Sequence, residues 1–142
     1  MKKISIKILG LVIGILFIGT IQAQDSEGSK YGEDSVKCIE NNSLYYEFFK
    51  QWKSSNYKNT AWKDAFGPWR WVFINCPAST KNIYLHGEKL VDEVLKHETD
   101  KTKKDKYIDT LMMVYDKRIQ YFGSEVYVLG KKVEDLYKLR TS

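Results

Sequence analysis

The segment Trp62-Lys-Asp-Ala-Phe-Gly-Pro-Trp-Arg-Trp-Val-Phe-Ile-Asn-Cys-Pro77 carries its large apolar side chains at helical spacing. Counted from Trp62, apolar residues recur at offsets of 3, 4, 7, 10, 11 and 14, which places them on one face of an α-helix and does not fit the alternation of a strand. Pro77 is expected to end this helix, because proline has no backbone N–H and disfavours helical geometry in the residue before it. Gly67-Pro68 leaves two alternatives open: a kink within the helix, or a regular helix that begins only at Pro68.

A second group of aromatic residues precedes this segment and predicts a partner helix. The side-chain oxygen of Asn42 or Ser43 is expected to cap its start. The polar run 53–60 is the expected turn, so the two helices should fold back on each other as an antiparallel hairpin. The apolar residues at helical spacing are Leu44, Tyr45, Phe48, Phe49 and Trp52.

The only two cysteines, Cys38 and Cys76, stand just before the first predicted helix and at the end of the second. Because the hairpin is antiparallel, these two positions should lie close together. An even number of cysteines in an exported chain favours a disulfide, which would stabilise the fold by about 3–4 kcal/mol in the chain-entropy model. The alternative is two buried thiols. A zinc site is not expected, because no Cys-x-x-Cys pair or histidine cluster completes one.

Apolar residues from Ile83 to Leu95 recur at helical spacing and predict a third helix with Gly87 in its interior. Glycine within a helix costs about 1 kcal/mol relative to alanine. We therefore expect Gly87 to lie where a neighbouring helix comes too close to leave room for a β-carbon.

The polar run 96–106 is expected to be a solvated loop, with contact between its lysines and an anionic surface as the alternative. A fourth helix is predicted over 107–121, with Gly123 as its left-handed cap. A fifth helix should begin at Val126 and continue through Tyr137.

Several of these residues resemble the tetratricopeptide repeat (TPR). Ala65, Trp69 and Pro77 stand at the offsets of the repeat's second helix, and Val72 stands at its other small apolar position. Two later patterns resemble the first helix of the repeat, Ile83-x-x-His86-Gly87-x-x-Leu90 and Val126-x-x-Leu129-Gly130-x-x-Val133.

The chain is also similar to exported TPR proteins of Gram-negative envelope bacteria, over roughly Cys38 to the C-terminus. The segments that carry this resemblance are 62–77, 107–119, 121–123 and 127–130. The resemblance implies an all-α solenoid of helical hairpins, about two and a half repeats long, whose first helices form a concave binding face.

The first 23 residues have the features of a secretory signal peptide. A positively charged start precedes an apolar run from Ile8 to Ile21, and Ala23 is the small residue before the expected cleavage point. A membrane anchor is the alternative, although the run is shorter than the ~20 residues that a spanning helix needs. Cleavage would leave a chain in the periplasm or cell envelope without a membrane span. A flexible arm over 24–37 and a helical domain over 38–142 are expected.

Composition and motifs argue against several function classes. The signal peptide holds three lysines of the net charge of +5, so the exported chain is near +2 and lacks the concentrated basic stripe of a nucleic-acid binder. Phosphate-binding loops, nucleophile elbows and haem-attachment motifs are absent from the sequence. Acidic pairs fall on polar helix faces, and the two histidines are far apart. No enzyme activity, cofactor or metal site is expected.

The remaining interpretation is a scaffold for a protein partner of unknown identity. Arg70 and Trp71 lie off the main apolar stripe and are candidates for an exposed anchor, although a wide apolar belt of the solenoid is the alternative place for Trp71. The resemblance to the TPR implies candidate contacts on the concave face at Tyr46, Lys50, Tyr84, Glu88 and Tyr127.

Two other readings stay open. The first is a small-ligand or glycan-binding module that uses exposed aromatic residues. An enclosed aromatic pocket would favour this module, and an open groove would favour the scaffold. The second is a shortened chain without a binding role, which an exposed apolar strip along 126–139 would support.

Overall fold

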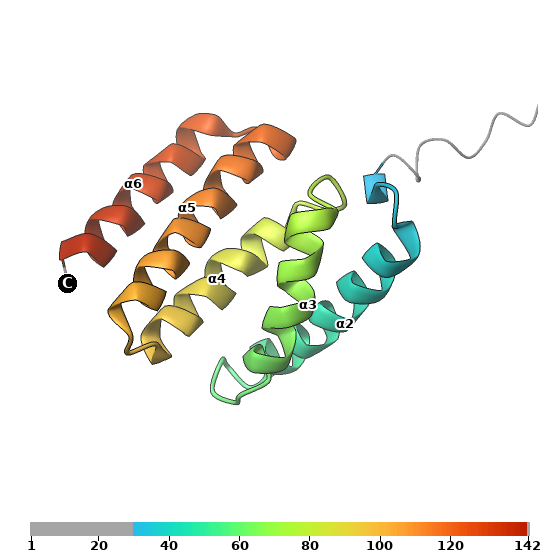
Figure 1. Ribbon diagram of the computed structural model, residues 1–142, viewed down its shortest axis with the longest axis horizontal. Coiled ribbons are helices and arrows are strands. Elements are labelled where there is room, and N and C mark those ends of the chain that lie inside the picture. The colour runs from blue at the N-terminus through green and yellow to red at the C-terminus, as the bar shows by residue number, and fades with distance from the viewer. Residues whose placement is uncertain (1–29, 142) are drawn as a thin grey trace, which may run out of the picture.

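The computed structural model describes residues 30–141, and every regular element in that part of the chain is a helix. The helices cross the molecule in chain order, from α2 at one edge to α6 at the other (Figure 1). The predicted all-α fold class is therefore confirmed. The expected signal peptide over 1–23 and residues 24–29 of the expected arm lie outside the described residues. The helices are α2 (Ser35–Ser54), α3 (Trp62–Asn75), α4 (Asn82–His97), α5 (Lys101–Phe122) and α6 (Glu125–Thr141).

Each helix packs mainly on its neighbour in sequence. Aromatic side chains also join alternate helices. The rings of Phe66 in α3 and Tyr107 in α5 meet edge to face at a centroid distance of 6.0 Å. The rings of Phe49 in α2 and His86 in α4 stack at 3.9 Å. Helices α3 and α5 therefore both pack on α4 and meet through these rings, and α2 contacts α4 through Phe49.

Helix α2 begins earlier than the sequence predicts. It starts at Ser35, where the carboxylate of Asp34 accepts a hydrogen bond from the backbone N–H of Lys37 at 3.4 Å. The predicted caps Asn42 and Ser43 lie inside the helix. The first two turns project few apolar side chains into the core, so the apolar periodicity of the sequence begins after the helix does.

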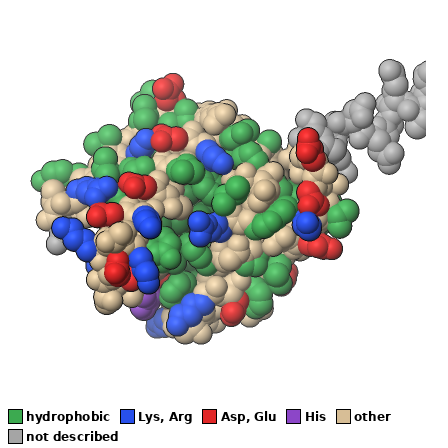
Figure 2. Space-filling view, viewed as in Figure 1, with side chains coloured by type: hydrophobic (Ala, Val, Ile, Leu, Met, Phe, Trp, Pro, Cys, Tyr) green, Lys and Arg blue, Asp and Glu red, His purple; other side chains and the backbone are tan. Residues whose placement is uncertain are grey.

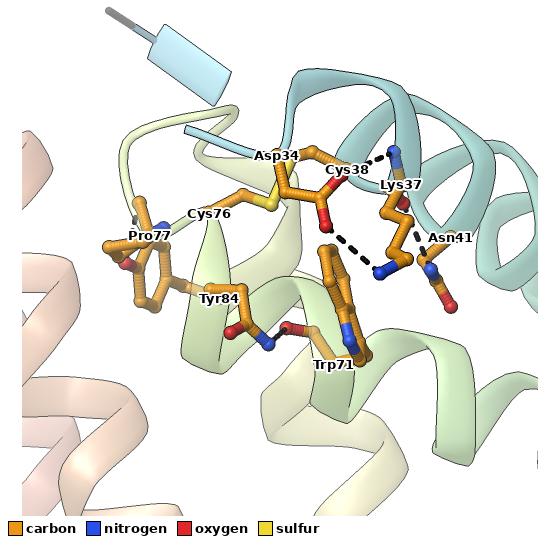
Figure 3. Close-up of a disulfide and its surroundings, with 9 residues drawn as sticks. Asp34, Lys37, Cys38, Asn41, Trp71, Cys76, Pro77 and Tyr84 are labelled. Carbon is orange, nitrogen blue, oxygen red and sulfur yellow. Dashed lines mark hydrogen bonds and ion pairs between the residues drawn. A yellow bond between two sulfur atoms is a disulfide. The ribbon is translucent and has the colours of Figure 1, made fainter. Parts of the chain in front are cut away.

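A disulfide joins the two predicted helices of the hairpin. Cys38 lies in the first turns of α2 and Cys76 directly follows α3, with their Cα atoms 6.1 Å apart (Figure 3). Both side chains are buried. The antiparallel hairpin brings the two sulfur atoms together, as the sequence predicts. The same end of the molecule is tied further by Tyr84, whose hydroxyl donates a hydrogen bond to the backbone carbonyl of Pro77 at 2.7 Å.

Helix α3 runs without interruption through Pro68, so the alternative in which the regular helix begins there is wrong. A proline at this position removes the hydrogen bond to the carbonyl of Asp64, four residues earlier. Asp64 is exposed in the first turn of the helix, where water can satisfy its carbonyl.

Helix α5 begins at Lys101, inside the run 96–106 that the sequence predicts to be a loop. The carboxylate of Asp100 caps it by accepting a hydrogen bond from the backbone N–H of Lys103 at 2.8 Å. The prediction is wrong because these first turns extend beyond the core and need no apolar residue. At the other end, Gly123 follows the helix with a φ of 67°, which favours glycine, and its N–H bonds back to the last turn.

Helix α3 approaches α4 closely at Gly87. The ring of Trp69 in α3 fills the place that a β-carbon of Gly87 would occupy, and its Cζ2 atom would be only 2.5 Å from that carbon. The indole N–H of Trp69 donates a hydrogen bond to the backbone carbonyl of Ile83 at 2.7 Å. Trp69 is fully buried. The expectation that Gly87 permits close helix packing is confirmed.

Gly87→Ala is expected to lower the free energy of unfolding by about 2 kcal/mol, because the added methyl group overlaps a buried ring that has no free space to move into. Urea denaturation followed by circular dichroism measures this change. The matched control is Gly130→Ala, since nothing lies within 4 Å of a β-carbon at Gly130. That change should stabilise by about 0.5–1 kcal/mol through helix propensity. Equal effects of the two substitutions would contradict the contact.

Candidate functional site

A groove between α3 and α5 is lined by aromatic and basic side chains. Phe66 and Tyr107 line its floor, and Arg70, Lys103 and Lys106 surround it. The cavity is about 240 Å³ in volume. We call these five residues the aromatic–cationic groove. On the face seen in Figure 2, hydrophobic and basic side chains likewise lie next to one another.

An adjoining hollow of about 280 Å³ extends this groove toward the start of α3. It shares Phe66 and Tyr107 with the groove and adds Trp62, whose ring stacks on His97 at a centroid distance of 5.3 Å. The two hollows therefore form one continuous surface along α3. Its length suits an extended or helical segment better than a compact small molecule.

Helical spacing explains how both helices supply this surface. Trp62, Phe66 and Arg70 stand four residues apart along one side of α3. Lys103 and Tyr107 have the same spacing on α5. Because α3 and α5 lie side by side, the two rows face each other across the groove.

The groove carries an unbalanced positive charge. Within residues 30–141, no ion pair is found for Arg70, Lys103 or Lys106. The acidic residue of the adjoining hollow is Glu98, and its carboxylate accepts hydrogen bonds from the backbone N–H groups of Thr99 and Asp100. The free cations and aromatic faces together favour a ligand with carboxylates and apolar groups.

Two of the residues proposed for a concave binding face serve the interior instead. Tyr84 is fully buried, so its side chain is not available to a partner. The carboxylate of Glu88 bonds Arg118 at 2.8 Å and also pairs with Lys131. The ring of Tyr84 meets Phe73 of α3 and Phe122 of α5, whereas Glu88 lies in the contact between α4, α5 and α6.

Three other concave-face candidates remain at the surface. Tyr46 is exposed and stacks on His86. Lys50 is exposed beside Glu47 on α2. Tyr127 is exposed on α6, and its ring lies 5.6 Å from the guanidinium carbon of Arg118. Tyr46 and Lys50 stand four residues apart on α2, whereas Tyr127 lies on α6.

The two anchor candidates have different surroundings. Arg70 is exposed and belongs to the aromatic–cationic groove. Trp71 is half-buried and packs against the core, near the disulfide (Figure 3). Its position fits the alternative in which Trp71 belongs to a wide apolar belt.

Sequence reasoning missed four residues of the groove. Phe66 is predicted as core, and Lys103 and Lys106 are predicted as part of a loop. Tyr107 is predicted only as a helix start. Lys103 and Tyr107 are four residues apart, which places them on one side of a helix. This spacing is informative only when Asp100 is recognised as the cap of α5, so that the helix includes Lys103.

The outermost helix is attached mainly by polar groups. Val128 is its only buried residue in the described part of the chain. The Glu88–Arg118–Lys131 cluster and a 2.5 Å hydrogen bond from the Tyr115 hydroxyl to Asp135 hold α6 against α4 and α5. Apolar side chains along 126–139 are exposed at several positions, as the alternative of a shortened chain requires, and these positions are Val126, Leu129, Val133, Leu136 and Tyr137.

Residues 30–141 contain no group of three or more side chains arranged to hold a metal ion. Within the same range, no helix has the length and apolar character needed to cross a membrane. Comparisons with protein-family models, curated proteins and solved structures found no match. The fold and site therefore define the chain as an all-α protein with an open aromatic and basic groove.

A separate aromatic cluster surrounds His86. Phe49 stacks on its ring at 3.9 Å, and the hydroxyl of Tyr45 lies 3.5 Å from its Nδ1 atom. Burial, together with the nearby charges of Lys53 and Lys89, lowers the pKa of His86 from 6.5 to about 4. The folded protein therefore holds this histidine neutral.

The unfolded chain takes up a proton at His86 at higher pH than the folded chain does. The free energy of unfolding should therefore fall as the pH drops from about 6.5 to 4. His86 should contribute about 1–2 kcal/mol of that loss. This is less than the whole pKa shift would give, because the ring is partly solvated. Comparing urea unfolding of the wild type and His86→Phe across this range isolates the contribution. A titration of His86 near pH 6.5 by NMR would disprove the assignment.

Proposed function

We propose that this protein is a non-enzymatic interaction scaffold, and that it binds an acidic segment of a protein partner in the aromatic–cationic groove. The observation that carries the proposal is the combination of Phe66 and Tyr107 with three unpaired cations on an open surface. Aromatic residues and arginine supply much of the binding energy at protein interfaces. Carboxylates of a partner would be steered to Arg70, Lys103 and Lys106.

Small-ligand or glycan binding is the alternative function. An enclosed aromatic pocket with convergent hydrogen-bonding groups would favour it. Three of the six residues that line this groove are cations, and Thr110 and the hydroxyl of Tyr107 are its uncharged hydrogen-bonding groups within the described chain. The lining therefore favours a charged polypeptide over a neutral sugar.

Export to the periplasm or cell envelope and a TPR-like solenoid belong to the same proposal. The buried disulfide fits an oxidising compartment. The row of helices, each packed on its neighbour in sequence, fits a short stack of hairpins of about two and a half repeats. Under this proposal, the N-terminal segment of the sequence directs export and is removed before Gln24.

Two pairs of lysines on α5 allow a matched test. Lys103 and Lys106 line the groove, whereas Lys101 and Lys104 do not. Envelope fractions of the source cell would be captured with the wild type, with Lys103→Gln/Lys106→Gln, and with Lys101→Gln/Lys104→Gln, after photocross-linking from position 110. Both pairs remove the same charge from the same helix.

Lys103→Gln/Lys106→Gln should weaken partner recovery by about tenfold, as expected for the loss of two partly solvated charge contacts. The other pair should leave recovery unchanged. Arg70→Gln should weaken recovery in the same direction. Retention of the partner by the groove variants would reject this site, and a folded protein that captures no partner would reject the scaffold.

Mass spectrometry of the protein isolated from the source cell should show a chain that begins at Gln24.

A further inference from the structure

A larger cavity lies at the junction of α4, α5 and α6. Its volume is about 520 Å³, more than either hollow of the aromatic–cationic groove. It is lined by the last turns of α4, the first turns of α5 and Leu139 near the end of α6. It shares no lining residue with the groove, so the first turns of α5 separate two different surfaces.

The cavity has an apolar floor. Leu95 of α4, Ile108 of α5 and Leu139 of α6 line it. Leu95 and Ile108 belong to the buried core, and Leu139 packs on its edge. Each of three helices therefore contributes one aliphatic side chain, which suits a hydrocarbon group.

Lysines surround this floor. Lys96, Lys101 and Lys104 line the same cavity. Lys101 and Lys104 have no carboxylate partner within residues 30–141. Their spacing of three residues brings both to one side of α5.

The acidic groups near the cavity are already paired. Asp92, which lines it, bonds Lys96 at 2.8 Å. Asp105 lies on the adjoining turn of α5 and bonds Arg140 at 2.6 Å. The charges of Lys101 and Lys104 are therefore not offset by a free carboxylate in the cavity lining, and an anion is the complementary ligand.

We propose that this cavity binds a soluble, single-chain amphiphilic anion. Its hydrocarbon chain would lie against Leu95, Ile108 and Leu139, and its acidic head would lie between Lys101 and Lys104. The volume falls within the range of small-molecule sites. This site does not depend on the partner-binding groove, because the two surfaces use different lysines of the same helix.

Titration calorimetry with decanoate tests the proposal, with decanol as the neutral analogue of equal chain length. One decanoate should bind per chain, and decanol should bind about tenfold more weakly because it lacks the charge. Lys101→Gln/Lys104→Gln should weaken decanoate binding about tenfold. Lys103→Gln/Lys106→Gln is the matched control and should leave the affinity within about twofold, since these lysines face the groove.

Equal losses in the two lysine pairs would overturn the proposal, because they would indicate general attraction to a basic surface. Equal affinity for decanol, or no decanoate binding, would also overturn it. Amide chemical shifts locate the ligand independently of the variants. Changes confined to 92–108 and the end of α6 are expected. Changes centred on the exposed strip at Val126, Val133 and Tyr137 would place the ligand elsewhere and reject the cavity.

Discussion

The packing of Trp69 against Gly87 sets the geometry on which the rest of the helical domain depends. The missing β-carbon lets the indole ring lie directly on α4, and the indole N–H bonds the carbonyl of Ile83 at 2.7 Å. This contact fixes how close α3 comes to α4. Because α5 packs on the same helix, the spacing between α3 and α4 also affects the distance between α3 and α5. The width of the aromatic–cationic groove therefore depends on Gly87, although α4 contributes no residue to the groove.

The two ends of the array are secured by different physical means. A disulfide and a dense aromatic core join α2 to α3. At the other end, α6 buries only Val128 among the described residues and relies on the ion cluster around Glu88. Breaking a buried ion pair by removing one partner typically costs about 3–5 kcal/mol. Arg118 is thus expected to matter more for the attachment of α6 than its exposed apolar residues do. Leu139 of α6 lines the larger cavity, so one side of that cavity belongs to a helix that is held mainly by charged groups.

The sequence predicts the parts of this structure that depend on local periodicity. The hairpin, the pairing of Cys38 with Cys76 and the close approach at Gly87 follow from helical spacing and from the known cost of a helical glycine. The starts of α2 and α5 were missed because Asp34 and Asp100 cap polar turns, where no apolar residue marks the helix. The groove was missed for the same reason, since Lys103 and Lys106 acquire a common face only when α5 extends back to Asp100. The burial of Tyr84 and Glu88 depends on which helices cover α4, and no local pattern contains that information.

The first turns of α5 give the domain two chemically distinct surfaces, because lysines two residues apart point to different neighbours. The aromatic–cationic groove requires the α3–α4 spacing that Trp69 and Gly87 set, whereas the larger cavity is lined by α4, α5 and α6. A double-mutant cycle between these two residues tests that contact most directly. We predict that Gly87→Ala costs at least about 1 kcal/mol less in a Trp69→Phe background than in the wild type, because the smaller ring leaves room for the methyl group. An equal cost in both backgrounds would show that the two residues do not interact, and would contradict the basis proposed here for the groove.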